Sequence, residues 1–261
     1  MKITLGFSPC PNDTYMFAAL VNKWIDTHDL EFEVSMEDVE TLNTWASQGK
    51  LDISKISFNR ALSLSDQYTL LNSGAALGNK CGPLVVAKQP LEKKEVENGK
   101  IALPGQWTTA HLLFSIFFPR ANNKVFMPFH QIEEAVLSGQ VLAGVIIHEN
   151  RFTYQAKGLT KITDLGDDWE TKTGFPIPLG GIFASTRLPA EMASLVESLI
   201  KESILFARNN EEKVMTYVRQ YSQEMDETVM KSHIDLYVND FSLDLGEKGQ
   251  KAVEMLKKIA L

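Results

Sequence analysis

Features that would indicate a membrane protein, a nucleic-acid-binding protein or an exported protein are scarce in this sequence. No apolar run approaches the roughly 20 residues that a membrane span requires. The N-terminus enters a strand-like run without the charged and apolar regions of an export signal. The formal net charge is -7 over 261 residues, with both signs scattered, so no basic surface is expected for nucleic acid or anionic lipid. We therefore expect a soluble, cytoplasmic protein with a small-molecule partner.

Disulfide, metal and common cofactor patterns are equally sparse. Only Cys10 and Cys81 are present, which predicts reduced thiols packed near the interior rather than a disulfide scaffold. The five histidines show no HExxH or comparable spacing, so no metal site is expected. The sequence also lacks GxGxxG, GxxxxGK(S/T) and GxSxG, the usual signs of dinucleotide, nucleoside triphosphate and serine hydrolase sites.

What the sequence does contain is one plan used twice, which indicates duplication of a structural unit. The first copy has a strand at 2–5, a helix at 13–24, a glycine that closes a second helix at Gly49, and an apolar strand at 51–57. The second copy has the same features at 100–103, 108–118, Gly139 and 141–148. Glycine after the last helical residue is the expected left-handed stop. Each copy also has a second strand ahead of the helix that the glycine closes, so both halves are βαβαβ. This order predicts an α/β fold with largely parallel sheets.

The segments between and after the two copies predict two lobes. Strand-like runs at 82–87 and 176–184 cross between the halves, and the Lys- and Glu-rich stretch 88–100 is typical of a linker. Helices predominate after residue 190, and we assign them to the first lobe. The predicted lobes are 1–88 with 182–261, and 89–181. Because ligands lie beyond the carboxyl ends of parallel strands, we expect the loops of both lobes to line one central cleft.

His148 ends the apolar run 141–148 and is the candidate catalytic base. A histidine at the end of a strand is outside the core yet shielded enough for its pKa to be tuned. The alternative is a histidine satisfied by backbone hydrogen bonds. Glu149 is expected to point to the opposite side if the strand continues. The carboxylate that orients His148, if one does, is left open among Asp38, Glu40 and Glu149.

Two further segments are candidates for binding an anion or a hydroxyl-rich ligand. Thr108, Thr109 and Ala110 start a helix, where unpaired N–H groups favour an anion, although ordinary capping by threonine explains them equally well. Lys55 and Ser57 end the strand equivalent to the one before His148, although Lys55 is otherwise a solvated side chain. The stiff loop 8–14 is either a shaped cleft wall or a plain turn before a helix that Asn12 or Asp13 caps.

Several motifs together identify a family. They are GFSPCPNDT at 6–14, EDVETLN at 37–43, GPLVV at 82–86, IIHENRFTY at 146–154, DLG at 164–166 and YVNDFSLD at 237–244. With these motifs the chain resembles 1,4-dihydroxy-6-naphthoate synthase of the futalosine pathway of menaquinone biosynthesis, nearly from end to end. The resemblance implies a two-lobed α/β fold like that of type II periplasmic binding proteins.

The resemblance also implies a reaction and a set of residues. The reaction is a carbon–carbon lyase step that converts cyclic dehypoxanthinyl futalosine to 1,4-dihydroxy-6-naphthoate, with no cofactor. His148 matches the family's proposed base, the matching substrate contacts are Lys55, Ile56, Ser57, Thr109 and Ala110, and further candidates are Asn12, Asn43 and Thr108. The alternatives are chorismate dehydratase, which has a similar fold and belongs to the same pathway, and a non-catalytic solute-binding protein.

Overall fold

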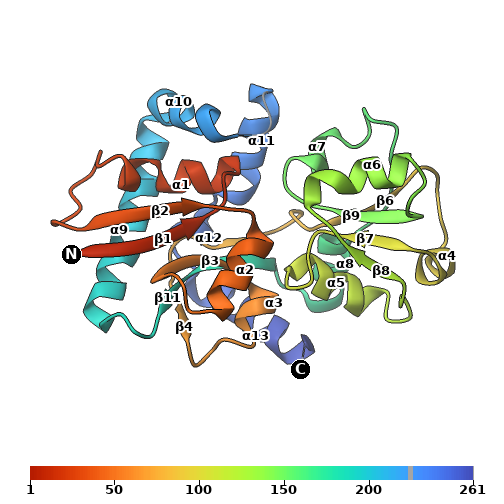
Figure 1. Ribbon diagram of the computed structural model, residues 1–261, viewed down its shortest axis with the longest axis horizontal. Coiled ribbons are helices and arrows are strands. Elements are labelled where there is room, and N and C mark those ends of the chain that lie inside the picture. The colour runs from red at the N-terminus through yellow and green to blue at the C-terminus, as the bar shows by residue number, and fades with distance from the viewer. Residues whose placement is uncertain (223–225, 261) are drawn as a thin grey trace. The chain divides into compact units, whose positions relative to one another are not determined.

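The computed structural model describes residues 1–222 and 226–260, which form two compact α/β units (Figure 1). The first unit comprises Met1–Gly78 and Pro178–Gln250, and the second comprises Asn79–Ile177 with the chain from Lys251 onward. The chain therefore enters the second unit at Asn79, before the predicted boundary at 88, and returns to the first unit at Pro178, before the predicted boundary at 182. Part of the C-terminal helical region, assigned as a whole to lobe one, groups with the second unit, and residue 261 lies outside the described residues.

The first unit is built on one mixed sheet. Its strand order is β2 (Glu31–Met36), β1 (Lys2–Phe7), β3 (Ile53–Ser57), β11 (Ile177–Ser185) and β4 (Tyr68–Leu70), and β5 (Ala76–Gly78) pairs with β11 off this path. β1 runs parallel to β2 and to β3, whereas β11 is antiparallel to β3 and β4. The predicted parallel pairing is confirmed for the three strands of the first βαβαβ copy.

The second unit repeats this topology. Its strand order is β8 (Lys124–Phe126), β7 (Ile101–Leu103), β9 (Ala143–Ile146), β6 (Leu84–Ala87) and β10 (Thr160–Asp164). β7 is parallel to β8 and β9, and β6 is antiparallel to β9 and β10. β6 and β10 follow β9 here as β11 and β4 follow β3 in the first sheet. Each sheet thus has an antiparallel strand, β11 or β6, beside the third strand of its copy. The sequence predicted both runs as strands but did not predict this pairing.

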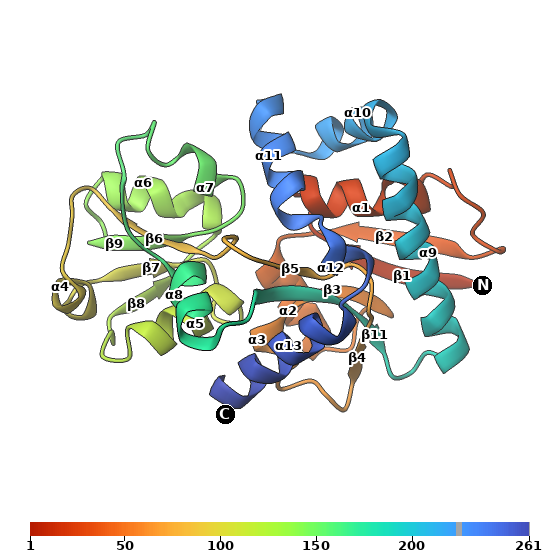
Figure 2. The ribbon, with the colours of Figure 1, turned by 180° about the vertical axis from the view of Figure 1, so that it is seen from behind.

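Helices cover the first sheet from chain segments far apart. One face packs against α1 (Pro11–Val21), α9 (Ala190–Asn209), α10 (Glu211–Tyr221) and α11 (Glu227–Tyr237), and Figure 2 shows α9 running beside α1. Alternate residues of β1 (Ile3, Leu5 and Phe7) point into this core. α2 (Val39–Ser47) packs on β3 and β1. The short helix α3 (Phe58–Ala61) follows β3, and α12 (Asp240–Leu243) and α13 (Gly246–Ala260) follow α11.

The second sheet has shorter helices. α6 (Ile132–Leu137) packs on β9 and β7. Alternate residues of β6, Leu84 and Val86, belong to the same apolar cluster. α5 (Thr109–Phe117) and α8 (Leu165–Thr173) contact each other, and they contact β9 and β6, respectively. The closing glycines Gly49 and Gly139 have φ angles of +62° and +78°, which confirms the predicted left-handed stops.

Two sequence predictions need correction here. The stretch 88–100 is not only a linker, because α4 (Lys93–Asn98) forms within it, and Glu92 and Glu95 make reciprocal capping bonds at its start. The strand at 84–87 belongs to the second sheet rather than to lobe one, because it pairs with β9 along its whole length. Such pairing depends on residues about sixty positions away, which a local pattern does not reveal.

Two expectations from composition can be compared with the structure directly. Cys10 and Cys81 are buried and form no disulfide within residues 1–222 and 226–260, as predicted. Burial raises the pKa of the Cys81 thiol to about 12, so this thiol stays protonated at neutral pH. Within residues 1–222 and 226–260, no helix combines the length and apolar character that crossing a membrane requires.

Candidate active site

The turn after β9 places the candidate base. β9 ends at Ile146, so the strand does not reach His148 as predicted, and His148 has a φ of 57°. Few residues with a side chain adopt this left-handed conformation, although histidine does so more often than most. The chain then enters α7 (Asn150–Thr153). The turn, rather than strand alternation, therefore sets the direction of the His148 side chain.

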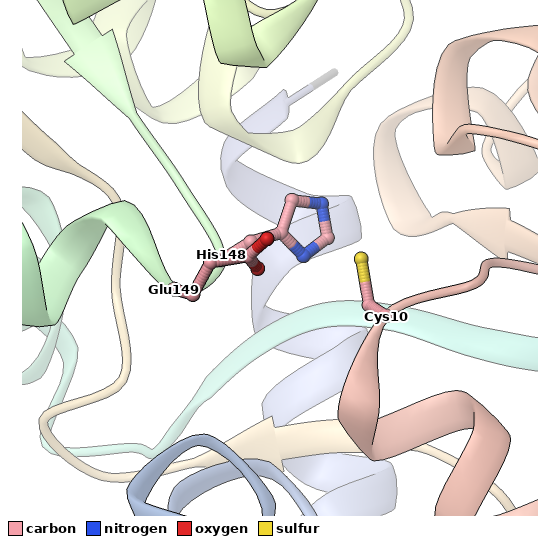
Figure 3. A group of neighbouring side chains, drawn as sticks. All are labelled: Cys10, His148 and Glu149. Atoms are coloured by element: carbon pink, nitrogen blue, oxygen red, sulfur yellow. The ribbon is translucent and has the colours of Figure 1, made fainter. Parts of the chain in front are cut away.

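The surroundings of His148 combine an aromatic ring with a carboxylate. Its imidazole is half-buried and lies 4.9 Å from the ring of Phe129, centroid to centroid, in the short helix η1 (Phe129–Gln131). Glu149 is buried, and its carboxylate and the imidazole have atoms within 4.8 Å of one another (Figure 3). The expectation that Glu149 points to the opposite side required the strand to continue, and β9 ends at Ile146 instead.

The two residues after Glu149 anchor this turn to the second unit. Asn150 donates from Nδ2 to Glu133 Oε2 over 2.7 Å, and Lys157 bonds the same oxygen. Arg151 donates to the carbonyls of Gly82 and Lys80 and forms an ion pair with Asp164 at 2.7 Å. The motif HENR thus joins a potential base to side chains that fix its backbone. A left-handed residue is retained only where its surroundings hold it in this way.

The start of α5 lies in the same unit. Thr108 is the N-cap residue, and its side chain accepts from the N–H of His111 and donates to the carbonyl of Gly105. The predicted helix start is thus confirmed, and so is the capping by threonine. Thr109 and Ala110 are the first two helical residues, and both are buried. Their N–H groups belong to the helix turn that lacks intrahelical acceptors, which is the property that favours an anion.

His111 lies in the first turn of α5 and is a second histidine to consider as a base. Its contacts differ from those of His148. Its Nδ1 lies 2.8 Å from the carbonyl of Gln106, and its Nε2 lies 3.4 Å from Lys124 Nζ. A carbonyl only accepts and an ammonium only donates, so Nδ1 carries the proton. Burial, together with the charge of Lys124, lowers the pKa of His111 despite the opposing effect of the Gln106 carbonyl. Of the two, His148 is the better candidate for a base.

The predicted contacts in the first unit lie at the carboxyl end of β3. Ser57 donates its N–H to Asn43 Oδ1 over 2.9 Å, and its hydroxyl accepts from Asn43 Nδ2 over 3.0 Å. Lys55 is not solvated, because its side chain is 8% exposed and forms an ion pair with Asp13 at 2.9 Å. The side chain of Ile56 is fully buried, so only its backbone is available to a ligand. The structure thus brings together Asn43, Lys55 and Ser57.

The loop before α1 differs from the prediction. The helix begins at Pro11, and its N-cap, Cys10, also drawn in Figure 3, makes no side-chain capping bond. Pro is favoured at the first helical position, which explains the earlier start. Asp13 is therefore no N-cap and instead reaches back to the N–H and hydroxyl of Ser8. Asn12 bonds both Asp13 and His233 of α11. The sequence indicated no functional role for Asp13 or His233. The bond from Lys55 to Asp13 and the bond between His233 and Asn12 each join segments that are distant in the sequence.

Comparison with known proteins gives a consistent result. A family model described as "Menaquinone biosynthesis" matches residues 3–261. A curated relative from Thermus thermophilus is 42% identical over 97% of this chain and 92% of its own length. One from Streptomyces coelicolor is 39% identical over 97% of this chain and 91% of its own length. Both are named 1,4-dihydroxy-6-naphthoate synthase.

Solved structures agree on the fold. A protein from Archaeoglobus fulgidus is 35% identical and superposes with a TM-score of 0.94, covering 99% of this chain and 96% of that chain. The periplasmic aliphatic sulphonate binding protein SsuA from Escherichia coli is 11% identical, with a TM-score of 0.68 over 98% of this chain and 87% of that chain. At that identity the likeness concerns the fold alone, which confirms the predicted periplasmic-binding-protein-like architecture.

Proposed function

Because this chain belongs to the menaquinone biosynthesis family, whose curated relatives are 1,4-dihydroxy-6-naphthoate synthases, we propose that it is a lyase acting on cyclic dehypoxanthinyl futalosine. The product is 1,4-dihydroxy-6-naphthoate, and a sugar-derived fragment leaves. The observation that carries the proposal is the 42% identity over 97% of the chain to a relative of that name. A small-molecule substrate also suits the acidic net charge of -7.

His148 is the proposed general base. It removes a hydroxyl proton from the ribose-derived ring, the oxygen forms a carbonyl, and the neighbouring carbon–carbon bond breaks in a retro-aldol-type step. Aromatisation of the naphthalene diol drives the reaction, so acid–base catalysis is sufficient and we propose no cofactor. The left-handed turn and the Phe129 contact support this role, because they hold the imidazole in one orientation.

Glu149 is the proposed partner of His148. Its carboxylate is in the same unit and has an atom within 4.8 Å of the imidazole. A buried carboxylate beside a base stabilises the imidazolium that forms on proton transfer and favours one ring orientation. Asp38, by contrast, caps α2 by accepting from the N–H groups of Glu40 and Thr41. We therefore choose Glu149 among the three carboxylates that the sequence left open.

The substrate contacts divide between two kinds of donor. We propose that Thr109 and Ala110 at the start of α5 hold the carboxylate, which substrate and product both retain. Lys55, Ile56 and Ser57, supported by Asn43, bind oxygens elsewhere on the substrate. Preoriented N–H groups require less ordering than a mobile side chain, which favours the helix start for a permanent anion.

The test is incubation of the purified protein with cyclic dehypoxanthinyl futalosine while the naphthalene chromophore is followed by absorbance. We expect the chromophore to appear with no added metal or nucleotide, and a denatured sample controls for spontaneous reaction. Chorismate is the parallel substrate. Dehydration of chorismate without chromophore formation would favour the chorismate dehydratase reading. Tight binding in calorimetry without turnover of either compound would favour a solute-binding protein.

A further inference from the structure

Five buried polar side chains form a connected cluster in the first unit that the proposed chemistry does not yet use in full. They belong to Ser8, Asn12, Asp13, Lys55 and His233, and as whole residues these are 3%, 5%, 1%, 6% and 0% exposed. Removing an ion pair from water costs more than an apolar pair of similar size in many proteins. Stability alone is therefore a weak reason for a buried Lys55–Asp13 pair, and a functional role has to be considered.

Asp13 is the centre of this cluster and accepts every bond that reaches it. Its Oδ2 accepts from the N–H and the hydroxyl of Ser8 over 3.1 and 2.7 Å. Its Oδ1 accepts from Asn12 Nδ2 over 2.8 Å and from Lys55 Nζ over 2.9 Å. Four donors from three residues leave the carboxylate a single orientation, and Lys55 is thereby drawn to a fixed point.

The hydrogen-bond directions extend to α11. A carboxylate oxygen only accepts, so the amide nitrogen of Asn12 faces Asp13, and the amide oxygen of Asn12 faces His233. His233 Nε2 lies 3.0 Å from that oxygen, so this nitrogen carries a proton and donates. The ring is also packed 4.7 Å from the ring of Tyr237. A residue of the C-terminal helices thus orients the pair through Asn12.

Lys55 retains donors for a ligand. An ammonium group has three N–H donors, and within residues 1–222 and 226–260 only the one to Asp13 is used. Ser57 lies on the same face of β3, because successive strand residues alternate. Its oxygen accepts from Asn43, so its O–H is directed elsewhere. One face of β3 therefore presents an ammonium and a hydroxyl about 7 Å apart along the chain.

We propose that Asp13 is a positioning residue, held by Ser8, Asn12 and His233, that fixes the Lys55 ammonium for an oxygen of the sugar-derived part of the substrate. This rests on the proposed function for the contact between Lys55 and substrate. Two donors with fixed spacing suit a fragment that carries several hydroxyl groups. Asp13 itself touches no substrate.

The first experiment separates positioning from a purely structural ion pair. Asp13→Asn, Lys55→Met and the double variant are compared with Glu197→Gln, the same carboxylate-to-amide change in the same unit, where Glu197 accepts from the N–H of Asn72. We expect KM for the cyclic substrate to rise about tenfold in all three network variants, as for loss of a charge-assisted hydrogen bond. Affinity for the naphthoate product, which lacks the sugar-derived fragment, should change little. The double variant should regain stability that Asp13→Asn loses, but not the wild-type KM.

The second experiment tests the distant end of the cluster. His233→Gln keeps an N–H donor for Asn12, whereas His233→Phe removes it. We expect His233→Phe to raise KM about threefold, as for loss of a neutral hydrogen bond, and His233→Gln to restore most of the wild-type value. A merely structural role predicts equal effects on substrate and product affinity and no rescue by glutamine.

A third readout is independent of turnover. In a protein labelled with 15N-lysine, an ammonium held by Asp13 and shielded from solvent should give a resolved, slowly exchanging NMR signal. The signal should disappear in Lys55→Met and broaden in Asp13→Asn. If wild-type protein forms no chromophore but this pattern holds, the proposed function fails while the positioning of Lys55 stands. A double variant with wild-type KM, or a Lys55 signal unchanged in Asp13→Asn, would overturn the inference.

Discussion

The two sheets share a strand order but end their third strands differently. In the first unit β3 runs to Ser57 and passes directly into α3, so Lys55 and Ser57 keep the alternation of a strand. In the second unit β9 stops at Ile146, and His148 adopts a left-handed turn before α7. The same topological position therefore carries a rigid set of donors in one unit and a separately oriented imidazole in the other.

The difference matches the two chemical roles that we propose for the two strand ends. The ammonium of Lys55 is compensated by Asp13 inside a cluster of fixed hydrogen bonds, which suits binding. The His148 imidazole is half-buried beside Phe129 and Glu149, which suits proton transfer. Substitutions at the two strand ends should accordingly affect different kinetic constants.

The largest expected effect is at the second strand end. His148→Ala should lower kcat about 10²-fold or more, in line with loss of a general base, and leave KM near its wild-type value. Steady-state kinetics on the cyclic substrate measures both constants. His130→Ala is the matched control, because His130 is an exposed histidine next to Phe129. Turnover of His148→Ala close to wild type would remove this residue from the role.

Gly82→Ala should have a comparably large effect, on stability rather than on rate. A methyl group at Gly82 would lie 2.2 Å from the backbone nitrogen of Gly166, where no flexible side chain can move away. We expect a cost of about 3 kcal/mol, the upper range for overpacking. Hydrogen exchange of β6 and β9 peptides should speed up. The control, Gly6→Ala in the first sheet, meets the end of the Leu51 side chain at 2.3 Å and should cost about 1 kcal/mol. Equal hydrogen-exchange protection of the β6 and β9 peptides in the two variants would contradict the expected larger cost of Gly82→Ala.

Glu149→Gln should have an intermediate effect. Without the negative charge, the imidazolium formed on proton transfer is less stable, and we expect kcat to fall about tenfold, part of the general-base contribution. The pH–rate profile is the informative measurement, since loss of the charge should move its acidic limb to lower pH. A profile identical to that of wild type would show that Glu149 does not act on His148.

The smallest expected effect is on affinity for the naphthoate product, and it is compared between one variant in each unit. Thr109→Pro removes one N–H at the start of α5, and proline is tolerated because Thr109 is the first helical residue. We expect this variant to weaken binding of the naphthoate product about fivefold, and more than Lys55→Met does. Thr109→Ala keeps the N–H and is the control. Calorimetry measures the affinities, and circular dichroism checks the fold. A larger loss in Lys55→Met would place the carboxylate on the first unit.

Much of the fold was accessible from local patterns. The βαβαβ order, the left-handed stops at Gly49 and Gly139 and the helix start capped by Thr108 all depend on residues within one or two turns of each other. The antiparallel strands β11 and β6 were not predicted as partners of β3 and β9. Their pairing joins distant segments, and a strand pattern does not specify which edge it will complete.

The candidate site divides in the same way. His148 was identifiable because it ends an apolar run within a recognisable motif, and Lys55 and Ser57 because they end the equivalent strand of the first copy. Asp13 and His233 were not, because Lys55 reaches Asp13 across 42 positions and His233 reaches Asn12 across 221. The direction of the Glu149 side chain was predicted only for a continuing strand, and the turn after Ile146 is not evident from the sequence.

By itself, the sequence determined the repeated α/β plan, the family and the residue types available for binding and proton transfer. Only the tertiary structure decided which of those residues act together. Hydrophobic periodicity and helix stops are properties of neighbouring residues, whereas a buried charge requires a partner that folding brings from elsewhere in the chain. The Lys55–Asp13 pair and the left-handed turn at His148 exist because packing holds them, and no local preference specifies either.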